Sequence, residues 1–224
     1  GHGGFIVGSE MSGGVRNISV SNCQFLGTDV GLRFKSNRGR GGVVENIHIS
    51  DIYMFNITTD SFLFDLYYGG KSASESLADG DTTPVDQPPF PVSEETPVFR
   101  NIYVRDLVSR NARRALFFNG LPEMNIENIH LENAFITARY GAELSESKEI
   151  TFNNVTVIPE EGPAYMLHNV KQFTADGIFS DDEKGNPLVE ITGERSEAVR
   201  LTGVPREQVE IASGADSSEV VCLN

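Results

Sequence analysis

One short stretch of this chain concentrates cationic side chains. The 224 residues carry 18 Lys and Arg against 32 Asp and Glu, a formal net charge of −14. Four of the cations nevertheless fall within eight positions: Arg33, Lys35, Arg38 and Arg40. Residues 1–40 hold five cations and two acids, a local charge of +3 that leaves −17 for the remainder. Such a stretch attracts anions, whereas the acidic balance of the whole chain disfavours a nucleic acid or an anionic membrane as its partner.

Arg33 and Lys35 are two positions apart, so both project from the same face if this segment is a β-strand. A guanidinium grips a carboxylate through two parallel hydrogen bonds, and an ammonium adds a second point charge. The pair therefore predicts a site for a carboxylate-bearing ligand. Arg38 and Arg40 repeat the spacing, but the glycines around them predict a loop. They are either outer contacts of the same ligand or solvated loop charges.

An internal repeat predicts the elements that position these residues. Five segments share the pattern apolar–x–Asn–Ile–x–apolar–x–Asn/Asp, with one Glu and one Ser as departures in the last: 15–22, 44–51, 99–106, 126–133 and 147–154. Their central isoleucines are spaced by 29, 55, 27 and 21 residues. Recurrence at this period indicates a solenoid, and the alternation inside each segment indicates a strand with one buried face.

Stacked coils of short strands predict an all-β fold, a parallel β-helix. The isoleucines should then stack in the interior from coil to coil. The asparagines that precede them should form a ladder of hydrogen-bonded amides along the axis: Asn17, Asn46, Asn101 and Asn128. A β-propeller is the alternative, but its repeats run to about 40 residues or more and hold several strands each.

The chain reads as a single domain over residues 1–224. Residues 71–97 contain six acids, one cation and half of the ten prolines, which predicts a surface loop inserted into the repeat. Removing those 27 residues turns the spacing of 55 into 28, in step with its neighbours. Residues 176–224, with eleven acids and four cations, are expected to form a degenerate C-terminal cap region. Cys23 and Cys222 are too few for a disulfide framework and are expected to be isolated thiols.

Two motifs near the start of the chain resemble a known family. They are a Gly-His-Gly motif at residues 1–3 and an Arg-x-Lys motif at residues 33–35, in this order and about one coil apart. Together with the sequence around them and the segment 64–68, they resemble glycoside hydrolase family 28, the polygalacturonases and related pectin hydrolases. The sequence of these segments resembles the bacterial, exo-acting branch of the family more than the fungal endo-enzymes. The resemblance extends over essentially the whole chain and implies a right-handed parallel β-helix.

The resemblance implies roles for individual residues. The substrate, galacturonan, is a polyanion, which suits Arg33 and Lys35. His2 matches the histidine that sits beside the catalytic carboxylates of the family, and its flanking glycines allow close approach to a sugar. Tyr68 stands about where the family places a substrate-contacting tyrosine, with core packing as the alternative. Glu10 is a candidate hydrogen-bond partner for a sugar.

The chain departs from the family in its catalytic carboxylates. Glycoside hydrolysis normally needs two carboxyl groups flanking the scissile bond. The family, which is of the inverting type, supplies aspartates from an Asn-x-Asp motif and an Asp-Asp pair, both upstream of Gly-His-Gly. The one Asp-Asp here, Asp181-Asp182, lies in the C-terminal region. We therefore expect the C-terminal portion of such an enzyme, lacking its N-terminal coils and inactive alone.

Two further readings stay open at this point. The chain could be a non-catalytic β-helix that binds oligogalacturonate, or a structural one that associates with itself through an exposed N-terminal coil. The four histidines show no metal-ligand spacing, so neither a metal nor a cofactor is expected. No apolar run is long enough to span a membrane. By resemblance alone, the parent protein is expected to be secreted or periplasmic.

Overall fold

The computed structural model describes residues 2–68, 88–181, 185–212 and 214–223. Within these ranges the chain forms thirteen β-strands and two short 3-10 helices, and none of the described residues is α-helical. The described part of the chain accordingly contains no helix long and apolar enough to cross a membrane.

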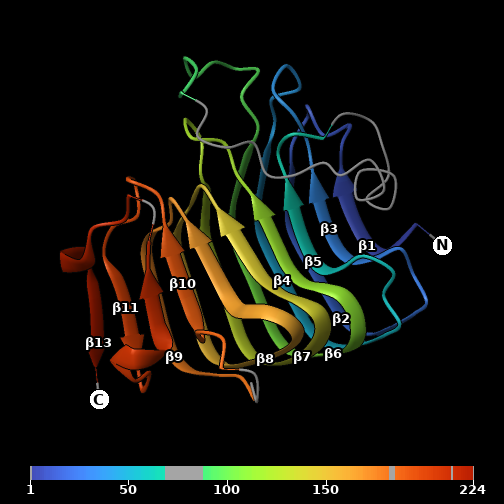
Figure 1. Cartoon of the computed structure of the whole chain (residues 1–224). Coiled ribbons are helices and arrows are strands. Elements are labelled where there is room, and N and C mark those ends of the chain that lie inside the picture. The colour runs from blue at the N-terminus through green and yellow to red at the C-terminus, as the bar shows by residue number, and fades with distance from the viewer. Residues whose placement is uncertain (1, 69–87, 182–184, 213, 224) are drawn as a thin grey trace.

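The strands follow one another along the chain and stack side by side (Figure 1). They are β1 (Gly3–Gly8), β2 (Val15–Leu26), β3 (Val30–Lys35), β4 (Val43–Phe55), β5 (Asp60–Asp65), β6 (Val98–Asn119), β7 (Ile126–Ser145), β8 (Ser147–His168), β9 (Lys171–Phe179), β10 (Val189–Thr192), β11 (Val199–Thr202), β12 (Val209–Ile211) and β13 (Val220–Leu223). The 3-10 helices are η1 (Arg206–Gln208) and η2 (Ser217–Glu219). Every pairing between these strands is parallel, as the repeat predicted for a parallel β-helix.

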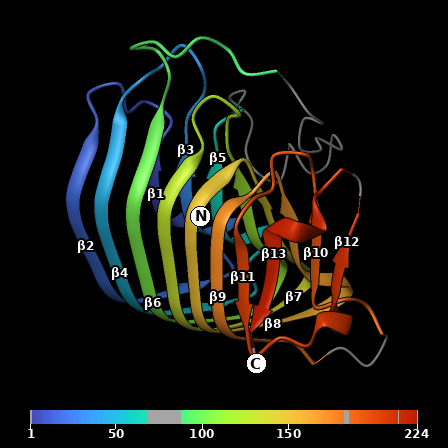
Figure 2. The same cartoon turned by 90° about the vertical axis from the view of Figure 1, so that its left-hand side faces the viewer.

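The strands build two stacked series. In one, β1, β3 and β5 are followed by the C-terminal parts of β6, β7 and β8, and then by β10 and β12. We call the outer surface of this series the site face. In the other, β2 and β4 are followed by the N-terminal parts of β6, β7 and β8, and then by β9, β11 and β13. We call its outer surface the ladder face; Figure 2 shows its strands curving alongside one another.

The predicted stack of apolar residues is confirmed. Ile47 pairs in register with Ile18 on one side and Ile102 on the other, and Ile102 pairs with Ile129. All but Ile18 are fully buried. A second stack lies under the site face, where the Phe34 and Phe64 rings are parallel at 4.8 Å and Phe118 meets Phe64 edge-on. This second stack supports the outward-facing residues of β3 and β5 from below.

The predicted asparagine ladder is also confirmed. Neighbouring amides are hydrogen-bonded at 3.4 Å between Asn17 and Asn46, 3.2 Å between Asn46 and Asn101, and 2.8 Å between Asn101 and Asn128. All four residues have a left-handed backbone, with φ between 53° and 59°. Asparagine tolerates this conformation better than other residues with a Cβ. The repeated Asn therefore marks a backbone bend in each coil as well as an axial hydrogen bond.

The long interval in the repeat falls between β5 and β6. Of the expected insertion at 71–97, residues 71–87 lie outside the described residues, and residues 88–97 contain no strand. In the expected cap region, the four short strands β10 to β13 extend both series. Cys23 and Cys222 are free thiols.

Candidate functional site

The site face brings Arg33 and Lys35 together at the end of β3. Phe34 points into the core and is fully buried, so the residues on either side of it face outward. Arg33 lies in register between Ile6 of β1 and Leu63 of β5, and the next outward position, Lys35, lies beside Asp65. The same-face placement predicted for the Arg-x-Lys pair is therefore what the strand shows.

Tyr68 lies over both cations, although it is 33 residues beyond Lys35. The Lys35 ammonium is 4.1 Å from the centre of the Tyr68 ring, and the Arg33 guanidinium carbon is 5.2 Å from it. The Tyr68 N–H donates to the Ser36 carbonyl at 3.1 Å, which fixes the start of this residue next to the end of β3. Tyr68 is half-buried, and its ring covers the cationic pair rather than filling the core.

Arg33 is the most deeply placed member of this group. Only 3% of it is exposed, and its Nε has no hydrogen-bond partner among the described residues. Buried polar groups are nearly always paired, with protein, water or ligand. Asn119 Oδ1, which lies in the same outward row as Lys35, is also buried without such a partner in the described ranges. A buried N–H donor of Arg33 and a buried C=O acceptor of Asn119 thus have no hydrogen-bond partner among the described residues.

Asp65 is the acidic member of the site. Its Oδ1 accepts hydrogen bonds from the Tyr67 N–H at 3.0 Å and from Asn119 Nδ2 at 3.2 Å. Burial raises the pKa of Asp65 above its ordinary value, although these hydrogen bonds and the nearby Arg33 oppose the rise. Asp65 is thus hydrogen-bonded to Tyr67 and Asn119 and lies beside Lys35 in the strand register.

His2 and Glu10 flank β1 at opposite ends. His2 is exposed and lies four residues before Ile6, the residue in register with Arg33, which is about 13 Å along the strand. Glu10 is exposed in the turn two residues beyond Gly8, the residue in register with Lys35. The described contacts join neither of them to Arg33 or Lys35.

The two loop arginines differ from each other. Arg38 forms a two-point ion pair with Glu123, at 2.6 Å from Nε to Oε1 and 2.9 Å from Nη2 to Oε2. It is therefore not simply one of the solvated loop charges. Arg40 is half-buried, and its backbone N–H donates to the Asn37 carbonyl at 3.3 Å.

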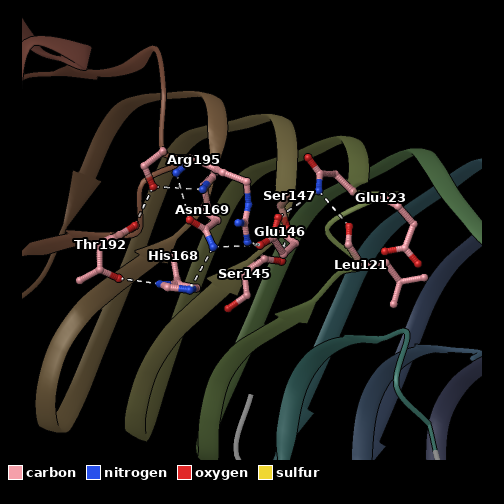
Figure 3. A network of polar contacts seen from close by, with 12 residues as sticks. Leu121, Glu123, Ser145, Glu146, Ser147, His168, Asn169, Thr192 and Arg195 are labelled. Atoms are coloured by element: carbon pink, nitrogen blue, oxygen red, sulfur yellow. Dashed lines mark hydrogen bonds and ion pairs between the residues drawn. The ribbon is translucent and has the colours of Figure 1, made fainter. Parts of the chain in front are cut away.

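A polar network continues the same edge of the site face beyond Asn119 (Figure 3). Glu146 is buried, with a left-handed backbone, and accepts from Arg195 and from Asn169 Nδ2 at 2.9 Å. His168 Nε2 contacts Asn169 at 3.1 Å, and its Nδ1 lies 2.9 Å from the Thr192 hydroxyl. These bonds join residues of successive coils, so the network ties the coils together.

The ladder face carries a separate hollow of about 430 Å³. It is lined in part by the rings of His48, Tyr103 and His130, which stack at 4.9 Å from centre to centre. Burial lowers the pKa of His130, which favours its neutral form. This hollow belongs to the other series of strands and contains none of the predicted site residues. No group of three or more His, Cys, Asp or Glu side chains in the described part of the chain could hold a metal ion.

The comparisons with known proteins agree with the motifs at β1 and β3. Residues 1–81 match the family model of the glycosyl hydrolases family 28. Over that range the chain is similar to this family. The match contains His2, the cationic pair and Tyr68, whereas the resemblance read from the motifs was expected to extend over essentially the whole chain.

Curated relatives extend the similarity beyond the family match. The chain is 25% identical over 168 residues to a probable polygalacturonase of Vitis vinifera, covering 70% of this chain and 30% of that protein. It is 40% identical over 78 residues to a polygalacturonase of Ralstonia nicotianae, covering 33% and 14%. It is 24% identical over 181 residues to an exo-poly-alpha-D-galacturonosidase of Dickeya chrysanthemi, covering 79% and 28%. The chain thus spans less than a third of the length of these relatives, and no solved structure matches it significantly.

Three residues of the site were not identified from the sequence. Asp65 and Asn119 align with Lys35 only through strand register, and Glu123 meets Arg38 across 85 residues. The repeat carried a signal for Asp65, because Arg33-x-Lys35 and Leu63-x-Asp65 are one coil of 30 residues apart. No comparable signal pointed to Glu123, which lies in a turn between β6 and β7.

Proposed function

We propose that this chain is part of a polygalacturonase-type glycoside hydrolase and that Arg33, Lys35 and Tyr68 bind galacturonate units of its substrate. The observation that carries the proposal is the gathering of two cations and an aromatic ring on one outer face of a chain with a net charge of −14. The family match and the polygalacturonase relatives support it. The parent protein would then act on pectin outside the cytoplasm.

The chemistry of the substrate fits these side chains. Each galacturonate carries one carboxylate, which a buried Arg and a neighbouring Lys can bind more strongly than a neutral sugar. The ring of Tyr68 is flat and half-buried, so it can cover a sugar ring on one side while its contact with Lys35 holds it in place.

The hydrolytic step needs groups that these 224 residues do not provide in the family's pattern. An inverting hydrolase uses one carboxyl group as acid and another as base. The sequence contains no Asn-x-Asp motif, and its one Asp-Asp pair begins at Asp181, on an exposed residue of the C-terminal region. We therefore propose that these 224 residues bind oligogalacturonate and do not hydrolyse it on their own.

Calorimetric titration with tetragalacturonate tests the binding proposal. Lys35→Ala should weaken binding by roughly tenfold, because a charge-assisted hydrogen bond is worth about 1.5–3 kcal/mol. Arg16→Ala is the matched control, since Arg16 is an exposed cation on β2 of the ladder face and its loss changes the net charge equally. Equal affinities of wild type, Lys35→Ala and Arg16→Ala would refute the site.

Release of reducing ends from polygalacturonate tests the second part. The 224 residues should release none above the rate of a His2→Ala variant. Release by the wild type above that control would contradict the proposal that the acid and base lie elsewhere. Binding without hydrolysis, even by the longer protein, would instead favour a carbohydrate-binding β-helix.

A further inference from the structure

Arg38 joins two loops that are distant in sequence. Its guanidinium is held at two points by the Glu123 carboxylate, at 2.6 and 2.9 Å. Only 3% of the Glu123 side chain is exposed, against 28% for Arg38. A two-point ion pair of this kind fixes the plane of the guanidinium as well as its position. The loop after β3 is therefore tied to the turn between β6 and β7.

Aromatic rings contact the same guanidinium. Its central carbon lies 5.2 Å from the centre of the Tyr67 ring and 4.5 Å from that of Phe90. Glu123 also accepts from the Phe90 N–H at 3.4 Å. We call Arg38, Glu123, Tyr67 and Phe90 the clasp. Two rings and one carboxylate leave Arg38 little room to grip a ligand carboxylate in the same two-point manner.

The charges of the clasp stabilise each other. The hydrogen bond with Glu123 raises the pKa of Arg38. Burial alone would raise the pKa of Glu123, but the hydrogen bonds with Arg38 and backbone N–H groups outweigh it, and the pKa is lowered. Both groups are therefore charged at neutral pH, and their charges cancel within the protein.

The clasp leads directly to the ligand-covering ring. Tyr67 forms an isolated bridge with Asn37, the residue before Arg38, and Tyr68 follows Tyr67 in the chain. The Tyr68 N–H is bound to the Ser36 carbonyl. The backbone that leads into Tyr68 is thus held by Ser36 and Asn37, the two residues before Arg38.

We propose that Arg38 is a positioning residue, which holds the Tyr67–Tyr68 segment so that the Tyr68 ring lies over Lys35 and Arg33. It acts through the clasp and does not contact the substrate. The proposal rests on the proposed function for its consequence in binding, but the placement of the ring is a property of the protein without any ligand. An outer contact, the role suggested by spacing alone, would require a guanidinium free of Glu123.

The placement of the ring is measured by NMR without ligand. An aromatic ring 4.1 Å from the Lys35 ammonium shifts the neighbouring methylene protons upfield. Tyr68→Leu should abolish that shift. Arg38→Gln should reduce it, and the charge exchange Arg38→Glu with Glu123→Arg should restore most of it. Arg40→Gln, a change of the same kind two residues away, should leave it unchanged. An unaltered Lys35 shift in Arg38→Gln would overturn the proposal.

Binding distinguishes positioning from contact. Arg38→Gln combined with Glu123→Gln removes both charges of the ion pair. This double variant should weaken tetragalacturonate binding about fivefold through the displaced ring and leave the salt dependence of the affinity as in wild type, because the local net charge is unchanged. The charge exchange should restore the affinity. A flatter salt dependence, as expected for Lys35→Ala, together with no rescue by the exchange, would identify Arg38 as a direct contact. If wild type binds nothing, the proposed function fails while the methylene shifts still decide the role of Arg38.

Discussion

The ammonium group of Lys35 lies 4.1 Å from the centre of the Tyr68 ring. At this distance the negative face of the ring attracts the cation, and the contact is stronger where water is partly excluded. Lys35, at the end of β3, is in this way held in place by Tyr68, which follows the neighbouring strand β5.

Removing the Tyr68 ring should weaken ligand binding. Tyr68→Leu keeps an apolar side chain but loses the cation contact, and we expect an affinity for tetragalacturonate lower by roughly three- to thirtyfold. Tyr68→Phe retains the face of the ring and should stay within about threefold of wild type. Calorimetric titration of both variants measures the difference. Equal losses in the two would show that the hydroxyl group, not the ring face, is what matters.

Asp65 should make the folded protein more stable at acidic pH than at neutral pH. Because its pKa is raised on folding, its contribution to stability is fully present below the unfolded pKa of about 3.9 and is lost as the pH rises through the folded pKa. Asp65→Asn should therefore gain stability relative to wild type between pH 4 and pH 7, as followed by urea unfolding. Asp181→Asn, at an exposed position, is the control. A gain that shrinks with rising pH would contradict the shift.

The buried carboxylate of Glu146 should contribute more to the free energy of unfolding than the exposed carboxylate of Glu149. Glu146 and Glu149 share the left-handed backbone, but Glu146 is buried against Arg195 and Asn169 whereas Glu149 is exposed. Glu146→Gln should lower the free energy of unfolding by about 1–3 kcal/mol, since Arg195 and Asn169 lose a charged acceptor. Glu149→Gln should change it by less than about 0.5 kcal/mol. Calorimetry of both variants provides the comparison.

Backbone conformation as well as hydrogen bonding should determine which substitutions the ladder asparagines tolerate. Asn101→Gly removes two side-chain hydrogen bonds and keeps a residue at ease with φ of 56°. Asn101→Val removes the same bonds and adds strain of about 1–2 kcal/mol. Urea unfolding should therefore rank wild type above Gly and Gly above Val. A glycine variant less stable than the valine variant would show that the backbone is not strained there.

The sequence predicted best those features that recur. The alternation around Ile18 and its counterparts set strand, buried face and coil stacking, because each coil repeats the same constraint. Arg33 and Lys35 could be placed on one face for the same reason. The left-handed backbone of the ladder asparagines was not predicted from the sequence. Residue type explains it once the structure shows a bend at these positions.

The contacts that do not recur were the ones missed. Arg38 and Glu123 lie 85 residues apart, on either side of the long interval between β5 and β6, and no period relates them. Their pairing depends on loop paths that composition does not specify. Asp65 matters because it lies in register with Lys35. Predicting that register from the sequence requires the exact number of residues in one coil.

The amide ladder has a direction. Asn46 donates to Asn17, Asn101 to Asn46 and Asn128 to Asn101, so every amide points its N–H towards the N-terminal neighbour and its oxygen the other way. Aligned in this manner, the amide dipoles add along the axis, as peptide dipoles do in a helix. An aspartate can receive a bond in such a column but cannot pass one on. In the parallel column of Asn154, Asn133 and Asp106, the bonds run from Asn154 to Asn133 and from Asn133 to Asp106, where the acid acts as a terminus.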